Sequence, residues 1–187
     1  MDSFLFTLLL VFAIALGGRD QILVAELSDA LGRSGQLLAL GLACSAASAA
    51  VMAWAGASLA AILPQRAAEM LVAFALAIAA FEMAWPAKVR RPAEPTRSLG
   101  AIGIVLLARQ VGDAARFAVF AFASEAVYPA VTVIGGALGG GAAVALGWSA
   151  GARGLARFPL RGIRLTLAAL LFLAALFIGL NARYQVY

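Results

Sequence analysis

The stretch that decides the fold is Ala108-Arg109-Gln110-Val111-Gly112-Asp113-Ala114-Ala115-Arg116-Phe117, which places a glycine and three ionisable side chains inside an otherwise apolar segment. A related stretch lies 95 residues earlier and reads Ala13-Ile14-Ala15-Leu16-Gly17-Gly18-Arg19-Asp20-Gln21-Ile22. There too, glycine is followed at once by charged residues within an apolar segment. We therefore expect the chain to be built around this pair of stretches.

The composition indicates an integral membrane protein. Of the 187 residues, 64% are hydrophobic and 12% are charged, and the mean hydropathy is +0.98, far from the values of soluble domains. Apolar runs of about 18 or more residues, long enough to span a bilayer as helices, account for nearly all of the chain. The expected fold is all-α, with six transmembrane helices.

A polar linker divides these spans into two groups of three. The expected spans cover residues 3–31, with a break near Gly17 and Gly18, and then 36–63, 67–85, 99–123, 128–152 and 163–182. The linker, 86–97, contains three prolines and four basic residues, which exclude a membrane-crossing helix. We expect a first repeat over 1–85 and a second over 98–187.

The two halves align without a gap at the offset of 95. The matched pairs are Gly17 with Gly112, Gly41 with Gly136, Gly56 with Gly151, Pro64 with Pro159, and Arg66 with Arg161. The Pro-x-Arg match recurs at the start of the third span of each half and favours an internal repeat. Because each half has three spans, the copies must enter the membrane in opposite senses, which is the inverted repeat of many secondary transporters.

The distribution of basic residues predicts the orientation. One side of the expected membrane carries Arg33, Lys88, Arg90, Arg91, Arg97, Arg153, Arg157, Arg161 and Arg164, and the other carries Arg66 and Arg183. The positive-inside rule makes the first side cytoplasmic and places both termini outside the cytoplasm. Short loops and a high content of Ala, Gly and Arg favour a bacterial inner membrane.

The residue inventory excludes several function classes. The chain has no histidine and a single cysteine, Cys44, so we expect no disulfide, no zinc or haem site, no cofactor and no intramembrane enzyme. The net charge of +5 lies mostly in the loops, where topology requires it, so nucleic acid is not expected as a partner. The small residues of the second and fifth spans predict close helix packing.

The charged motifs predict a central polar site. Its expected members are Arg19, Asp20, Gln21, Arg109, Gln110, Asp113 and Arg116. Spacings of four and three would put Arg109, Asp113 and Arg116 on one helix face, with Asp113 between two cations. We expect an internal salt-bridge cluster, because ionisable groups inside a bilayer face a partner or a cavity.

Other residues of the motifs receive simpler interpretations. Gly17, Gly18 and Gly112 are the expected sites of helix breaks or close helix crossings. Glu26 and Asp29 share a helix face and are interpreted as solvated groups at the mouth of the first span. Glu69 and Glu82 lie toward the ends of the third span and are interpreted as interfacial.

The chain resembles the Golgi, thylakoid and bacterial manganese and calcium transporters, a branch of the lysine-exporter superfamily. In that family each half opens with Glu-x-Gly-Asp-Lys/Arg-Ser/Thr-Gln. The resemblance covers the whole chain: a motif in the first and fourth spans, Pro-x-Arg before the third, and a basic central loop. It implies cation/proton exchange, with the Glu and Asp of both motifs as cation ligands.

The motif residues match only in part. Gly17, Arg19 and Gln21 keep the family's residue types, whereas Ala15 and Gly18 stand where its Glu and Asp occur, and Asp20 stands at the hydroxyl position. In the second motif Gly112 and Asp113 match. Gln110 replaces the Glu, and Ala114, Ala115 and Arg116 replace the last three residues. Asp113 and the Gln110 amide are therefore the metal ligands that the resemblance implies.

Two functions remain open at this point. The first is a transporter that moves manganese or calcium, or instead a monovalent ion or an anionic solute held by the arginines. The second is an accessory or assembly subunit of a larger membrane complex. Such a subunit would no longer transport, and its charged side chains would form contacts between helices. The expected partners are the lipid bilayer, a divalent cation, and either other subunits or further copies of the chain.

Overall fold

The computed structural model describes residues 2–86 and 98–184, and these residues form helices without any strand. The helices are α1 (Asp2–Ala15), α2 (Arg19–Leu31), α3 (Gly35–Ile62), α4 (Gln65–Ala84), α5 (Leu99–Val111), α6 (Ala114–Glu125), α7 (Pro129–Leu155) and α8 (Leu160–Tyr184). The linker from 87 to 97 lies outside the described residues. The all-helical prediction is confirmed for the described part of the chain.

Four of these helices, α3, α4, α7 and α8, are long and apolar enough to cross a membrane. The α1–α2 pair qualifies as a fifth candidate if it is one span, bent by 64° at its break. Large apolar side chains on α8, including Phe172, Leu173 and Phe177, are exposed and compatible with a lipid environment. The expected fourth span, 99–123, is divided into the short helices α5 and α6, so the count of six spans stays a prediction.

Glycine and aspartate account for the two breaks. Gly17 has φ +70°, a left-handed conformation that glycine adopts without a steric cost. At the second break, Gly112 ends α5, and the side chain of Asp113 caps α6 by accepting a hydrogen bond from the backbone amide of Ala115 at 3.2 Å. The expected breaks at Gly17 and Gly112 are confirmed.

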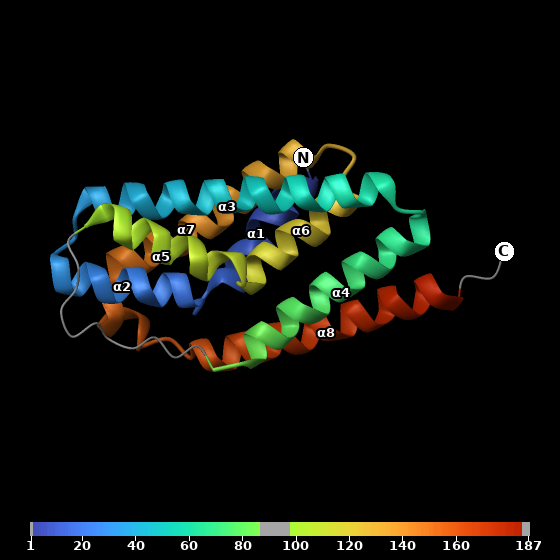
Figure 1. The fold of residues 1–187 in the computed structure, drawn as a ribbon. Coiled ribbons are helices and arrows are strands. Elements are labelled where there is room, and N and C mark those ends of the chain that lie inside the picture. The colour runs from blue at the N-terminus through green and yellow to red at the C-terminus, as the bar shows by residue number, and fades with distance from the viewer. Residues whose placement is uncertain (1, 87–97, 185–187) are drawn as a thin grey trace.

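The helix starts repeat at the offset found in the sequence. Adding 95 to the first residues of α2 and α4, 19 and 65, gives 114 and 160, the first residues of α6 and α8. For α3 the sum of 35 and 95 is 130, and α7 begins at 129. Figure 1 shows α3 and α7 running in opposite directions, and likewise α4 and α8.

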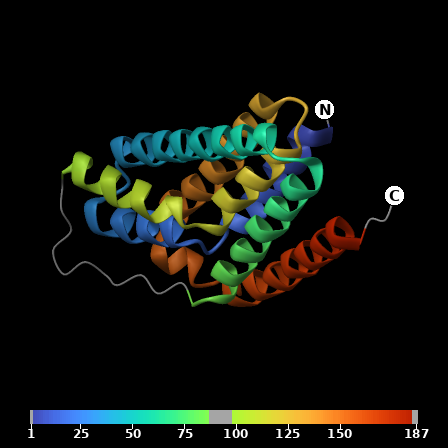
Figure 2. The same ribbon diagram turned by 45° about the vertical axis from the view of Figure 1, so that its right-hand side comes forward.

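The core forms where α3 and α7 pack together with α1, α2 and α6 around them, and α8 lies alongside α4 at the edge of the bundle (Figures 1 and 2). Small residues permit these crossings. A Cβ atom at Gly139 of α7 would lie 2.5 Å from the carbonyl oxygen of Leu8 in α1, and one at Gly147 would lie 2.7 Å from that of Gln21 in α2. The predicted role of small residues in helix packing is confirmed at these crossings.

The turns α2–α3 and α7–α8 lie at one end of the bundle, and the turns α3–α4 and α6–α7 lie at the other, where α1 begins and α8 ends (Figure 1). Arg33, Arg153 and Arg157 belong to the first end, and Arg66 and Arg183 belong to the second. Arg164, which the sequence also places at the first end, lies in the first turns of α8 and is 2% exposed, so its charge is inside the bundle and not in a loop.

Candidate functional site

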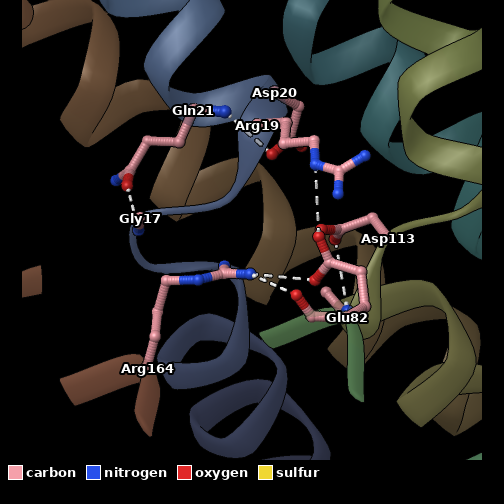
Figure 3. A network of polar contacts seen from close by, with 8 residues as sticks. Gly17, Arg19, Asp20, Gln21, Glu82, Asp113 and Arg164 are labelled. Atoms are coloured by element: carbon pink, nitrogen blue, oxygen red, sulfur yellow. Dashed lines mark hydrogen bonds and ion pairs between the residues drawn. The ribbon is translucent and has the colours of Figure 1, made fainter. Parts of the chain in front are cut away.

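The two helix breaks meet inside the bundle. A Cβ atom at Gly18, in the first break, would lie 2.9 Å from Asp20 Oδ1 and 3.5 Å from Asp113 Oδ1, which belongs to the second break. Gly18 therefore lies close to carboxylate oxygens from both breaks, and a larger residue there would have to displace the Asp20 carboxylate. Figure 3 shows Asp20, from the first half of the chain, and Asp113, from the second, within one group of polar side chains.

One carboxylate oxygen of Asp113 accepts a hydrogen bond, and the other does not. Its Oδ2 accepts the capping hydrogen bond from Ala115, whereas its buried Oδ1 has no hydrogen-bond partner among the described residues. The residue is 4% exposed. A buried polar atom without a partner is costly and therefore rare in proteins, so this oxygen is a candidate for binding a proton or a cation.

A chain of buried hydrogen bonds connects Arg116 to Asp20 through Ser48 and Gln110. The guanidinium Nε of Arg116 donates to Ser48 Oγ at 2.6 Å, and Ser48 Oγ donates to Gln110 Oε1 at 2.9 Å. Gln110 Nε2 then donates to Asp20 Oδ2 at 3.2 Å. Arg116 also donates from Nη2 to Ser45 Oγ at 3.1 Å. The network joins α2, α3, α5 and α6, and each of its side chains is buried.

Gln21 occupies in α2 the place that Arg116 occupies in α6. It donates from Nε2 to the carbonyl oxygen of Ala143 in α7 at 2.8 Å, and its Oε1 accepts a hydrogen bond from the backbone amide of Gly17 at 2.7 Å. Adding 95 to 21 gives 116, and adding 95 to 48 gives 143. The hydrogen bond from Gln21 to Ala143 therefore joins the same pair of positions, with the halves exchanged, as the hydrogen bond from Arg116 to Ser48. The two halves thus use equivalent positions at the centre of the bundle.

A buried ion-pair group closes the site on the side of α4 and α8. Arg164 Nη2 donates to Glu82 Oε2 at 2.9 Å and to the backbone carbonyl of Glu82 at 3.3 Å, and Arg19 Nε lies 3.5 Å from Glu82 Oε1 (Figure 3). Glu82 is 8% exposed, so its interpretation as an interfacial residue was wrong. Nε and Nη1 of Arg164 have no hydrogen-bond partner among the described residues.

Glu82 and Arg164 were not predicted as site residues, although the helical periodicity of buried positions in α4 and α8 includes both. Glu82 continues the buried positions 75 and 79 of α4 at spacings of four and three. Arg164 begins the series 164, 168, 171 and 175, which are all buried in α8. Both charges therefore lie on the apolar stripes along which these two helices pack, as helical periodicity would indicate.

Arg109 does not join the buried cluster. Because α5 ends at Val111 and α6 begins at Ala114, the helical periodicity that would align Arg109 with Asp113 and Arg116 is interrupted. The expectation of one helix face with Asp113 between two cations was wrong for this reason. Arg109 is half-buried and lines a separate pocket together with Arg19, Trp85 and Pro86.

The implied metal ligands are not brought together as a set. Both polar atoms of the Gln110 amide are engaged, by Ser48 and Asp20, and Asp113 is bonded to Ala115. The described residues contain no group of three or more His, Cys, Asp or Glu side chains that could hold a metal ion. Asp29, the expected solvated residue, is exposed, and its carboxylate accepts a hydrogen bond from the amide of Ala152 at 3.0 Å beside the Gly151 kink of α7.

The central cluster contains equal numbers of opposite charges: the carboxylates of Asp20, Glu82 and Asp113 and the guanidiniums of Arg19, Arg116 and Arg164. The arginines are held by Glu82 and the serine hydroxyls, while Asp113 keeps an oxygen open. The open oxygen of Asp113 is therefore the place in this neutral cluster where a proton or a cation would bind.

The family expectation rests on the sequence motifs alone. No protein-family model, curated protein or solved structure matches this chain.

Proposed function

We propose that the chain is a transporter-like membrane protein that exchanges protons for a cation at Asp113. The single observation that carries this proposal is the unpartnered Oδ1 of Asp113 at the meeting point of two broken helices. In the proposed exchange, a proton leaves the Asp113 carboxyl group when a cation binds to the same oxygens, and it returns when the cation leaves. The resemblance to manganese and calcium transporters makes these two ions the first substrates to test.

The proposal includes an architecture of two inverted three-helix repeats, with α1–α2 and α5–α6 each forming one broken span. The recurrence of helix starts at the offset of 95 and the opposite directions of α3 and α7 support this architecture. The equivalent contacts of Gln21 and Arg116 support it at the level of side chains. Transporters of this plan bind their substrates near the midplane, where discontinuous helices from the two repeats meet.

The charges around Asp113 limit the kind of cation that it can bind. A hard divalent cation takes six or more oxygen ligands, whereas Asp113 Oδ1 and Glu82 Oε1 are the buried carboxylate oxygens without a hydrogen-bond donor in the described residues. Arg19, at 3.5 Å, must leave Glu82 before that oxygen can serve a cation. A divalent substrate would therefore bring most of its ligands as water, while a proton or a monovalent cation needs only Asp113.

We also propose that the end with the α2–α3 and α7–α8 turns is cytoplasmic and that both termini lie outside, in a bacterial inner membrane. Arg33, Arg153 and Arg157 at that end support this orientation through the positive-inside rule. Cysteines introduced in place of Arg33 and Arg183 should react with an impermeant thiol reagent from opposite sides of the membrane. Labelling of both positions from the same side would contradict the orientation.

The hydrogen-bonded network favours a second candidate, a non-transporting accessory subunit of a larger membrane complex. Arg116, Ser48, Gln110 and Asp20 satisfy one another and join four helices, as interhelical polar contacts do in structural proteins. In this candidate Asp113 acts only as the N-cap of α6. The two candidates differ in whether removing the charge of Asp113 changes ion movement or stability.

The test is transport by purified protein in proteoliposomes, with Mn²⁺ or Ca²⁺ and with or without a pH gradient. The Asp113→Asn variant keeps the size of the side chain and removes its charge, and Asp29→Asn is the matched control, since Asp29 is exposed and lies outside the cluster. Loss of ion and proton flux in Asp113→Asn, with the control active, supports exchange at Asp113. Flux that is unchanged in Asp113→Asn contradicts it, and a well-folded wild type without any flux favours the accessory subunit.

A further inference from the structure

A pocket of about 680 Å³ lies beside the central cluster, with which it shares Arg19, at a place where three helix ends converge. Arg19 from the first turn of α2, Arg109 from the last turn of α5, and Trp85 and Pro86 at the end of α4 line it. No acidic side chain occurs among the described residues of its lining. The exchange proposed at Asp113 does not use this pocket.

The positive charge of the pocket is only partly neutralised by its surroundings. Arg109 has no ion-pair or hydrogen-bond partner in the part of the chain that the structure describes. Arg19 meets Glu82 only through Nε, at 3.5 Å, and its side chain is 40% exposed. Two like charges that face one pocket repel each other, and an anion between them would reverse the sign of that interaction.

We propose that this pocket binds a phosphate group. A guanidinium presents paired N–H donors that match two oxygens of a phosphate, and two arginines can bind three or more phosphate oxygens. Basic pockets between membrane helices bind lipid headgroup phosphates, so the source is either an anionic phospholipid or a free phosphate ion.

The first arm of the test uses lipid. The protein is reconstituted in nanodiscs of phosphatidylcholine with a fraction of phosphatidylglycerol, and the lipid that stays bound after extraction is measured by native mass spectrometry. The second arm titrates inorganic phosphate into protein in a neutral detergent and follows the heat of binding. Retention of phosphatidylglycerol identifies the lipid as the source, and saturable phosphate binding without lipid identifies the free ion; either result supports the site.

Arg109→Gln is the test variant, because Arg109 is half-buried and forms no contact that stabilises the fold in the described structure. We expect it to weaken binding about tenfold, the effect of one charge-assisted hydrogen-bonding group. Arg33→Gln is the matched control, an exposed arginine at the basic end and outside the pocket. It should change the affinity less than twofold.

Trp85 provides a measurement that does not depend on an arginine variant. Binding of phosphate or phosphatidylglycerol should change the tryptophan fluorescence of the wild type, and this change should be absent in Trp85→Phe, since the other tryptophans, Trp54 and Trp148, do not line the pocket. Absence of binding in both arms overturns the proposal. An equal loss of affinity in Arg33→Gln and Arg109→Gln also overturns it, because it would reflect general surface charge.

Discussion

Replacement of Ser48 by alanine removes a hydroxyl that joins two buried polar groups. Ser48 Oγ accepts a hydrogen bond from Arg116 Nε at 2.6 Å and donates one to Gln110 Oε1 at 2.9 Å. Arg116 is 1% exposed and Gln110 is 0% exposed, so bulk water does not reach the groups that lose their partner. The variant therefore leaves one charged donor and one amide oxygen unsatisfied inside the bundle.

The magnitude follows from the two lost bonds. A hydrogen bond to a charged group contributes about 1.5 to 3 kcal/mol and one between neutral groups about 1 kcal/mol in soluble proteins. Coupling between helices in membranes is weaker, about 0.6 kcal/mol on average and at most about 1.7. Arg116 also keeps its bond to Ser45. We expect the free energy of unfolding to fall by about 2 kcal/mol.

The assay is reversible unfolding in mixed micelles with increasing sodium dodecyl sulfate, followed by circular dichroism. Ser149→Ala is the matched control, because Ser149 is exposed and its hydroxyl bonds only to the Leu146 carbonyl of the preceding turn at 3.1 Å. It should leave the stability unchanged. If Ser48→Ala is as stable as Ser149→Ala, the network does not hold the four helices together and the reasoning fails.

Two further predictions concern helix packing and the ion pair. Gly139→Ala should lower the free energy of unfolding by about 2 to 3 kcal/mol, because its Cβ would lie 2.5 Å from a backbone oxygen of α1, whereas Gly162→Ala, with no atom within 4 Å, should not destabilise the protein in the same unfolding assay. Equal effects of the two variants would contradict the close α1–α7 crossing. Glu82→Gln should cost about 3 kcal/mol because it leaves the buried Arg164 without a counter-charge, and the double variant with Arg164→Gln should recover part of this loss. No recovery would show that Glu82 acts independently of Arg164.

Local chemistry explains why the helix breaks could be predicted. Gly17 and Gly112 are followed by charged or capping residues within a few positions, and the structure places a break at each. The same is true of the burial of Asp113, which follows from its place in an apolar segment. A break requires only glycine, an N-cap and a chain that cannot continue as a helix, all of which are visible in the sequence.

The break also explains the principal error in the predicted site. Spacing alone aligned Arg109 with Asp113 and Arg116, but the helical period does not continue across Gly112. Arg109 consequently faces a pocket with Trp85, while Arg116 turns to the serines of α3. A break changes the direction of every side chain that follows it, so an argument from spacing holds only within one helix.

The sequence by itself determined that the chain is helical and apolar, where its helices break, and that Asp20, Asp113 and Arg116 enter the bundle, because hydropathy, glycine and capping act over a few neighbouring residues. Only the tertiary structure decided which charges meet. Glu82 and Arg164 are 82 residues apart, and Gln110 and Asp20 are 90 residues apart. Such pairs depend on how α4 packs on α8 and how α2 packs on α5, and these crossings are set by the small residues of several helices at once.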